Sequence, residues 1–182
     1  MKKLTILLTF LTTLLFSDAK MDTYTLYQAK EYKQACDAGN VLLEQYKNDE
    51  EFVSLYAFSC LEADDLDRLM RPITLLKRSA EARANAAYFS VIVMQKKLLI
   101  HALADGYELS PVKLPTTEYV LSTVFDLYTK DTTKKQKRRF SYQDPQDPTT
   151  SYRLYTTKGN ASAKIIIEEY QDNNMTKRHI YW

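Results

Sequence analysis

A change in sequence pattern near residue 130 constrains the fold of this chain more than any other feature. Before it, apolar residues recur at intervals of three and four, and no proline occurs between Lys20 and Arg71. After it come β-branched runs, threonines, tyrosines and the turn sequences Asp144-Pro145 and Asp147-Pro148. The first pattern is typical of amphipathic helices, and the second of short strands separated by turns. We therefore predict an α+β fold, with antiparallel helical hairpins followed by a small antiparallel β-sheet.

The charges divide at the same place. Residues 20–129 contain 12 lysines and arginines against 16 acidic residues, whereas residues 130–182 contain 11 against 6. We predict a helical domain over 20–129 and a basic, aromatic β-meander tail over 130–182 that docks on the helices. Polar breaks predict helices near 23–28, 32–46, 50–60, 66–76, 80–104 and 117–128. Turn residues in the tail predict strands at 139–142, 152–157, 163–170 and 175–182.

Residues 1–19 have the organisation of a secretory signal peptide. Two lysines precede an apolar stretch over 4–16, and the small residues of Ser17-Asp18-Ala19 suit a signal peptidase. We expect cleavage after Ala19 and a periplasmic location for the mature chain. The alternative is an uncleaved membrane anchor, although the apolar stretch is shorter than the roughly 20 residues that span a bilayer. No later segment is expected to cross a membrane.

The two cysteines, Cys36 and Cys60, are 24 residues apart and do not form a CxxC motif. In an oxidising compartment they predict one disulfide between neighbouring helices, which would add about 3 kcal/mol by loop entropy. The alternative is two buried free thiols. With only two histidines besides, the chain offers little for a metal centre, and we predict no metal and no cofactor. Three scattered glycines exclude a glycine-rich phosphate loop.

The helical pattern suggests an internal repeat. A shift of 34 residues places Tyr32 on Leu66 and Ala35 on Leu69. Together with the turn-like segment 30–35 and the small residue Ala57, this part of the chain, about 22–104, resembles tetratricopeptide repeats. The proline that the family keeps between repeats is replaced by Lys47 and Glu81. The resemblance implies a curved helical surface that binds a peptide or helix of another protein, and the alternative is an ordinary helical bundle.

The tail supplies the candidate interaction residues. A run of five cations creates a local positive field that suits acidic protein, lipid head groups or anionic wall polymers; it comprises Lys134, Lys135, Lys137, Arg138 and Arg139. The alternative is a solvated linker. Aromatic side chains mixed with arginine often anchor interfaces, which makes Tyr152, Tyr155 and Trp182 candidates. The alternative is cross-strand pairing within the sheet. Period-two alternation places Tyr152 and Leu154 on one face, and Arg153 and Tyr155 on the other.

Asn174-Met175-Thr176 is a glycosylation acceptor pattern. With Asp172 two residues before the asparagine, it resembles the extended acceptor of bacterial periplasmic N-glycosylation, so Asn174 is a candidate glycosylation site. The alternative is a plain asparagine-rich turn.

Catalysis has little support in the sequence. Asp64, Asp65 and Asp67 are explained by a helix start, and His101 by a core or capping role. No nucleophile stands in a motif with a base beside it.

We therefore predict a non-enzymatic periplasmic adaptor or scaffold. It would bind another cell-envelope protein through its helical surface and its basic, aromatic tail. The basic run also allows contact with a membrane surface, and no nucleic-acid partner is expected. A periplasmic ligand-binding protein for a cell-wall or lipid fragment is the alternative, and a small hydrolase is the third.

Overall fold

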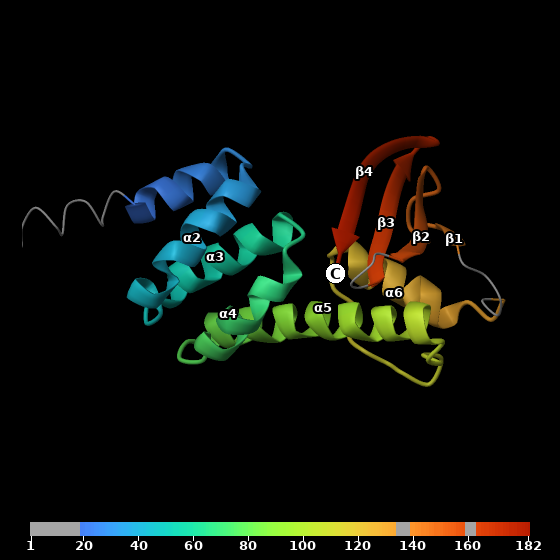
Figure 1. Cartoon of the computed structure of the whole chain (residues 1–182), viewed down its shortest axis with the longest axis horizontal. Helices are drawn as coiled ribbons and strands as arrows, with labels where there is room; N and C mark the ends of the chain where they lie inside the picture. The colour runs from blue at the N-terminus through green and yellow to red at the C-terminus, as the bar shows by residue number, and fades with distance from the viewer. Residues whose placement is uncertain (1–18, 134–138, 159–162) are drawn as a thin grey trace, which may run out of the picture. The chain divides into compact units, whose positions relative to one another are not determined.

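The computed structural model describes residues 19–133, 139–158 and 163–182, and it confirms the predicted α+β class (Figure 1). The helical elements are a helix at residues 19–28, α2 (Tyr32–Tyr46), α3 (Glu50–Glu62), the 3-10 helix η1 (Leu66–Leu69), α4 (Met70–Leu75), α5 (Ala80–Asp105) and α6 (Val120–Lys130). The strands are β1 (Arg139–Gln143), β2 (Thr150–Lys158), β3 (Ala163–Gln171) and β4 (Asn174–Tyr181).

The chain divides within α5 into two compact units, Met1–Ala87 and Tyr88–Trp182. The change from helix to strand falls near residue 130, as the sequence predicts, but the division into units comes earlier in the chain. The reason is that α6 belongs with the sheet: the ring of Tyr128 lies 5.2 Å from that of Phe140.

In the first unit, α2 and α3 pack antiparallel. The end of α2 meets the beginning of α3 through the rings of Tyr46 and Phe52, whose centroids are 4.9 Å apart. Gly39 allows a close approach in the middle of the pair, directly against Tyr56. The core of this unit is apolar and completely enclosed; its buried members include Leu43, Phe52, Val53, Tyr56, Ala57, Leu61, Leu66, Leu69 and Leu76.

Carboxylates fix two helix starts in the first unit. The side chain of Asp49 accepts the backbone N–H of Phe52 and caps α3. The side chain of Glu50 accepts the backbone N–H groups of residues 77, 78 and 79, which lead into α5. These bonds, first that of Arg78, lower the pKa of Glu50 to about 2. The start of α5 is therefore tied to the start of α3.

Two predicted helix starts need correction. The segment 66–76 begins as the 3-10 helix η1 without a side-chain cap from Asp65, which instead pairs with Arg68. Pro72 lies in the first turn of α4, where its missing N–H costs no hydrogen bond. The last helix begins at Val120 rather than beside Thr117, because Tyr119 is still extended. The helix predicted near 80–104 ends at Asp105, and Gly106 follows it at φ +76°.

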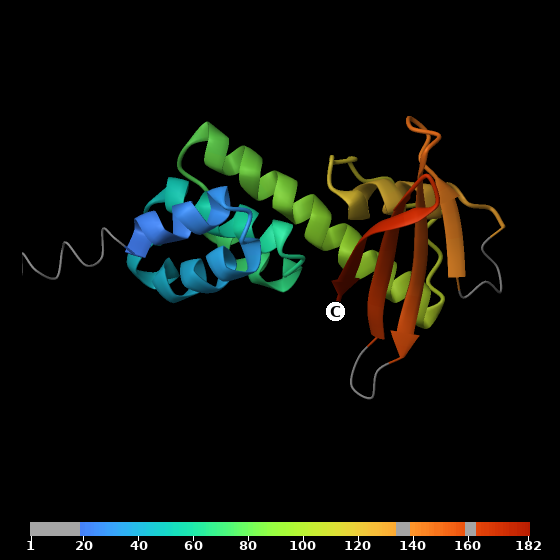
Figure 2. The ribbon, with the colours of Figure 1, turned by 90° about the horizontal axis from the view of Figure 1, so that it is seen from above.

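The second unit is built around the sheet, whose order is β1-β2-β3-β4 with every pair antiparallel (Figure 2). The predicted meander is therefore confirmed. One face is buried and packs near α6; it carries Phe140, Tyr152, Leu154, Ile165, Ile167, His179 and Tyr181. The hydroxyl of Tyr181 donates to that of Tyr119, 3.1 Å away, just before α6. Ile166 is also buried, so the sequence Ile165-Ile166-Ile167 is covered on both faces of β3.

The expectation that no later segment could cross a membrane also needs correction. Within the described residues, α5 is the one helix long and apolar enough to do so by length and composition. However, Lys96 and Lys97 lie in the second half of α5, and a charge at the centre of a membrane helix costs about 3 kcal/mol. Phe89, Ile92 and Leu99 of the same helix are completely buried within the protein.

Candidate interaction surface

The face of the sheet opposite the buried one carries a cluster of cations and aromatic rings. Strand register places Arg153 of β2, Glu168 of β3 and Arg178 of β4 in one row, because Arg153 pairs with Glu168 and Glu168 with Arg178. The next row holds Arg139, Tyr155, Ile166 and Ile180. We call the polar and aromatic side chains of this face the outer cluster: Arg139, Arg153, Tyr155, Lys164, Glu168, Tyr170, Arg178 and Trp182.

Glu168 is the centre of the outer cluster and is almost completely buried. Its Oε1 atom accepts from Tyr155 at 2.9 Å and from Nε and Nη2 of Arg178 at 3.0 and 2.7 Å. Its Oε2 atom accepts from the Tyr170 hydroxyl at 2.9 Å. Burial by itself would raise the pKa of Glu168, but these hydrogen bonds outweigh it and hold that pKa below its usual range. The carboxylate therefore stays ionised and organises the groups around it.

The cations of the outer cluster are held in place by aromatic rings. The Arg153 guanidinium lies 4.3 Å from the centre of the Tyr170 ring and also donates to its hydroxyl at 2.8 Å. The Arg139 guanidinium lies 5.0 Å from the Tyr155 ring centre. Each such contact contributes about 0.5–1 kcal/mol at an exposed site. Arg139 and Arg153 are thus oriented before any partner arrives, while both side chains remain exposed.

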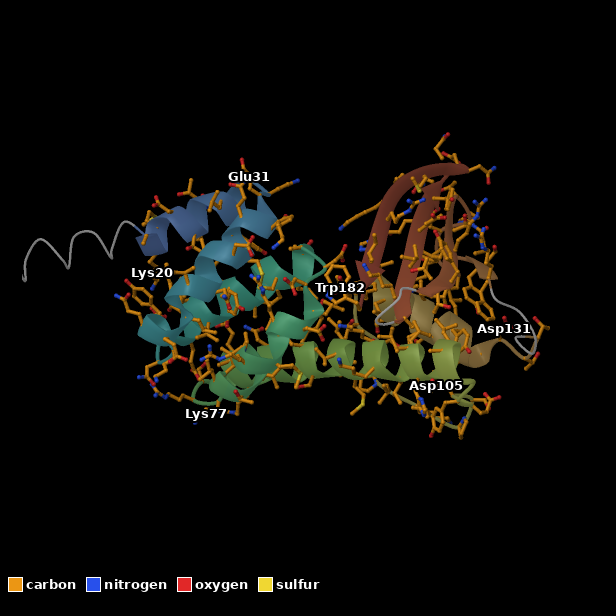
Figure 3. All side chains as sticks on the ribbon, in the orientation of Figure 1. Lys20, Glu31, Lys77, Asp105, Asp131 and Trp182 are labelled. Carbon is orange, nitrogen blue, oxygen red and sulfur yellow. A yellow bond between two sulfur atoms is a disulfide. The ribbon has the colours of Figure 1, made fainter. Side chains whose placement is uncertain are left out.

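The charge of this face is strongly positive. Four cations, Arg139, Arg153, Lys164 and Arg178, surround one carboxylate, Glu168, which leaves an excess of three positive charges. Lys164 lies 4.7 Å from the ring centre of Trp182, which is 56% exposed. Trp182 is labelled among the side chains in Figure 3. Planar guanidinium groups that keep free N–H edges are well suited to carboxylate and phosphate oxygens. The surface can therefore bind an anionic partner through charge and aromatic contact together.

The structure brings together three of the predicted interaction residues, Arg139, Tyr155 and Trp182. Tyr152 does not join them: its side chain is 6% exposed on the opposite face, and its hydroxyl donates to Asp144 at 2.7 Å. This is the face on which the alternation of β2 places it, so Tyr152 is a core residue and not a surface contact. The remaining members of the basic run, Lys134, Lys135, Lys137 and Arg138, lie outside the described residues.

Sequence reasoning missed most of the outer cluster. Lys164, Glu168, Tyr170 and Arg178 lie on β3 and β4, and none of them stands in a motif. The available signal is alternation along β3, where 164, 166, 168 and 170 share a face. Their association with Arg153 and Tyr155 depends on the register between strands, which the sequence of one strand does not contain.

Asn174 is exposed at the first position of β4, directly after the tight turn between β3 and β4. Asp172 and Asn173 form the turn with positive φ angles of 49° and 66°. The Asn174 amide donates to the backbone oxygen of Asp172 at 3.4 Å. The side chain is thus accessible to solvent, but its backbone is part of an ordered hairpin.

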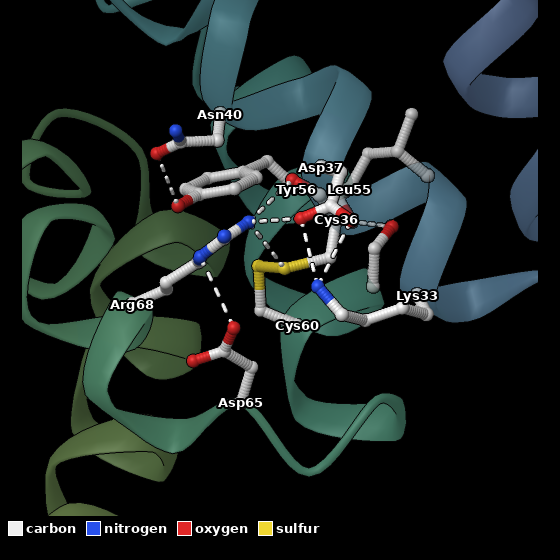
Figure 4. The surroundings of a disulfide bond; sticks show 10 residues. Lys33, Cys36, Asp37, Asn40, Leu55, Tyr56, Cys60, Asp65 and Arg68 are labelled. Atoms are coloured by element: carbon white, nitrogen blue, oxygen red, sulfur yellow. Dashed lines mark hydrogen bonds and ion pairs between the residues drawn. A yellow bond between two sulfur atoms is a disulfide. The ribbon is translucent and has the colours of Figure 1, made fainter.

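The predicted disulfide between Cys36 and Cys60 is present and joins α2 to α3 (Figure 4). The Cα atoms are 4.8 Å apart and both residues are completely buried. Arg68 covers the bond: its Nη1 lies 3.5 Å from the Cys36 sulfur and 2.7 Å from an Asp37 carboxylate oxygen. The alternative of two free thiols is therefore wrong for this structure.

The second unit also has a polar cleft of about 1030 Å³. Its lining comes from the start of the unit, from α6 and the residues before it, from the turn after β1 and from β2. The chief members are Tyr88, Thr117, Asp126, Lys130, Asp144 and Tyr152. Asp126 accepts from Thr116 at 2.5 Å, and Asp144 accepts from Tyr152. A smaller groove in the first unit, about 680 Å³, is more apolar and is lined by Lys20, Met21, Tyr24, Tyr46 and Phe52 among others.

Two of the groups considered for catalysis, His101 and Asp65, are each paired with a neighbour. His101 is half exposed; its Nδ1 pairs with Asp105 at 2.8 Å, and its ring stacks on Tyr107 at the end of α5. Asp65 pairs with Arg68. Within the described ranges, no three histidines, cysteines or carboxylates gather in a way that could hold a metal ion.

Comparison with family models, with curated proteins and with solved structures finds no match to this chain. The resemblance to tetratricopeptide repeats therefore stays a prediction.

Proposed function

We propose that this protein is a non-enzymatic periplasmic adaptor, which binds an anionic region of another cell-envelope protein. The observation that carries the proposal is the outer cluster, where aromatic rings and one buried carboxylate orient exposed arginines on β1, β2 and β4. Oriented cations cost less side-chain entropy to immobilise than free ones, which favours recognition of a partner. Arginine and aromatic residues are also the types that dominate binding energy at protein interfaces.

The helical part supplies a second surface for the same function. The antiparallel pair α2 and α3, linked by its disulfide, is consistent with the hairpin of a tetratricopeptide-like repeat. The disulfide also supports the periplasmic location, since such bonds persist in oxidising compartments. Residues 1–18, which contain nearly all of the predicted signal peptide, lie outside the described residues.

The test is crosslinking in the native host, followed by affinity purification and mass spectrometry of the tagged full chain. The variant Arg139→Ser/Arg153→Ser removes two exposed cations without removing a hydrogen bond to Glu168. We expect it to lose a dominant envelope protein that the wild type captures. The matched control Lys47→Ser/Lys113→Ser removes two exposed cations elsewhere and should keep that protein. Recovery of the wild type alone, or equal losses in both variants, would contradict the proposal.

A second candidate function is binding of a cell-wall fragment in the polar cleft. Hydroxyls, carboxylates and the Tyr88 ring are the groups that suit a sugar or a short polar peptide rather than a lipid chain. A ligand that binds only the folded state raises the unfolding temperature. We would measure this temperature with soluble disaccharide-peptide wall fragments, using Asp126→Asn as the cleft variant. A shift in the wild type that the variant loses would favour this function over the adaptor.

A further inference from the structure

The two edges of the sheet differ in length and shape. β1 has five residues and pairs with residues 151–155, so that β2 extends past it. β4 has eight residues and has a strand partner on only one side, because it stands at the end of the order β1-β2-β3-β4. At about 3.4 Å per residue, β4 offers an edge of about 27 Å. This is enough backbone to pair with an extended segment of similar length.

β4 exposes apolar side chains that a protected edge would avoid. Six of its eight residues are exposed, among them Met175 and Ile180, and Trp182 follows directly at its end. These three are a third of the nine large hydrophobic side chains exposed over the described residues. Natural sheets usually protect such edges with charges and short strands, and β4 has two cations but is long and keeps these apolar side chains exposed. An eight-residue edge with this apolar content therefore has the properties of a binding surface.

The charge of β4 indicates which kind of extended segment can pair with it. The strand contains two cations, Lys177 and Arg178, and no acidic residue. Its one histidine, His179, is buried and pairs with Glu169 of β3. Two copies of β4 paired with each other would bring these cations close together, which is unfavourable. Arg153 and Arg178 on the adjoining outer face extend the same positive field. Charge complementarity therefore favours an acidic segment and disfavours a second copy of this chain.

We propose that an extended acidic segment of the partner protein adds to the sheet as a fifth strand beside β4. This inference rests on the adaptor function proposed above and specifies the form of its ligand. Backbone hydrogen bonds to β4 supply affinity that does not depend on sequence, as in other cases of strand addition. Acidic side chains on one face of the added strand contact Lys177, and apolar ones on its other face contact Ile180 and Trp182.

The experiment uses the full mature chain and a synthetic peptide of alternating Glu and Val, capped at both ends. Binding is followed by NMR shifts and hydrogen exchange of the backbone amides, with the α2–α3 pair as internal reference. We expect the peptide to slow exchange on β4 and to leave α2 and α3 unchanged. A peptide of identical side chains with N-methylated central residues keeps the charge but lacks the backbone donors. It should bind at least about tenfold more weakly.

A charge variant tests the acidic preference separately. Lys177→Gln should weaken binding of the peptide about threefold at low salt and less at high salt, whereas Lys113→Gln should leave it unchanged. A matching peptide of alternating Lys and Val should not bind.

Equal binding of the N-methylated peptide, or protection elsewhere than β4, would overturn the strand-addition proposal. So would equal binding of the lysine peptide, or a concentration-dependent dimer that protects β4 without any peptide. These failures are distinct from failure of the adaptor function. If crosslinking still captures an envelope protein that depends on Arg139 and Arg153, the adaptor function stands and only its mode of recognition is wrong.

Discussion

Replacing Gly39 by alanine sets two opposing effects against each other in the α2–α3 pair. At an exposed position inside a helix, alanine is more stable than glycine by about 1 kcal/mol. At Gly39, however, an added Cβ would lie 2.7 Å from Cδ2 of Tyr56 and 3.2 Å from its Cβ and Cγ, where ordinary contact begins near 3.4 Å. The Tyr56 ring is 1% exposed and its hydroxyl donates to Asn40, so it has little room to move. Overpacking of this kind costs about 1–3 kcal/mol.

The cost less the gain leaves a net destabilisation, so we expect Gly39→Ala to lower the free energy of unfolding by up to about 2 kcal/mol. Urea unfolding followed by circular dichroism measures the loss. In a Tyr56→Leu background, where the side chain can rotate away, the same substitution should be neutral or stabilise by up to about 1 kcal/mol. A stabilising effect of Gly39→Ala in the wild type, or equal effects in both backgrounds, would refute the reasoning from close packing.

Gly106 provides the control, because it depends on backbone conformation and not on space. No heavy atom lies within 4 Å of an added Cβ there, and φ is +76°. Gly106→Ala should cost about 1–2 kcal/mol by the left-handed strain alone. Asparagine tolerates this conformation, so Gly106→Asn should recover part of the loss, whereas Gly39→Asn should not improve on Gly39→Ala.

Three further outcomes follow from the structure. The double variant Cys36→Ala/Cys60→Ala should unfold about 3 kcal/mol more easily than the oxidised wild type in urea, and alkylation without a reductant should leave the wild-type mass unchanged. The pKa of Glu50 is lowered to about 2, so its contribution to stability is complete above pH 4.5 and is lost as the pH falls toward 2. The wild type and Glu50→Gln should therefore converge in urea midpoint over that range. Intact mass of the protein from its native host should exceed the chain mass if Asn174 is glycosylated, and Asn174→Gln should remove the excess.

Each of these outcomes has a direct contradiction. Modification of two thiols in the unreduced protein would exclude the disulfide in solution. If the difference in urea midpoint between the wild type and Glu50→Gln stays constant from pH 7 to about pH 2, the backbone hydrogen bonds to Glu50 do not have the proposed role. An unmodified mass from the native host would leave Asn174 as a plain turn residue.

The order and type of the elements could be predicted because each depends on local pattern. The apolar spacing of α2 and α3 and the cap at Asp49 are contained in short windows of sequence, and the structure confirms them. The disulfide could be predicted for a similar reason, since the chain has only one possible pair. The inward position of Leu154 follows from period-two alternation alone.

The outer cluster could not be predicted because it depends on pairing between strands. In the sequence, Glu168 looks like an ordinary strand residue. Only the register between strands places it between Arg153 and Arg178, where it accepts hydrogen bonds from two tyrosine hydroxyls. A shift of one residue would have moved it to the other face. The contact of Glu50 with the residues before α5 has the same character, because its partners lie 27 to 29 residues away. The residues next to Glu168 and Glu50 in the sequence therefore do not indicate which partners these two carboxylates contact.

The strand order of the sheet also bears on how quickly the second unit reaches its native state. Each strand pairs only with its neighbour in the chain, so no pairing has to wait for a long crossover to close. Folding rates of small domains rise as contacts become more local, because less loop entropy is lost before contacts form. β3 and β4 are joined by Asp172 and Asn173 alone, so this hairpin is a natural nucleus. We expect the sheet to refold faster than a sheet of equal size with long connections.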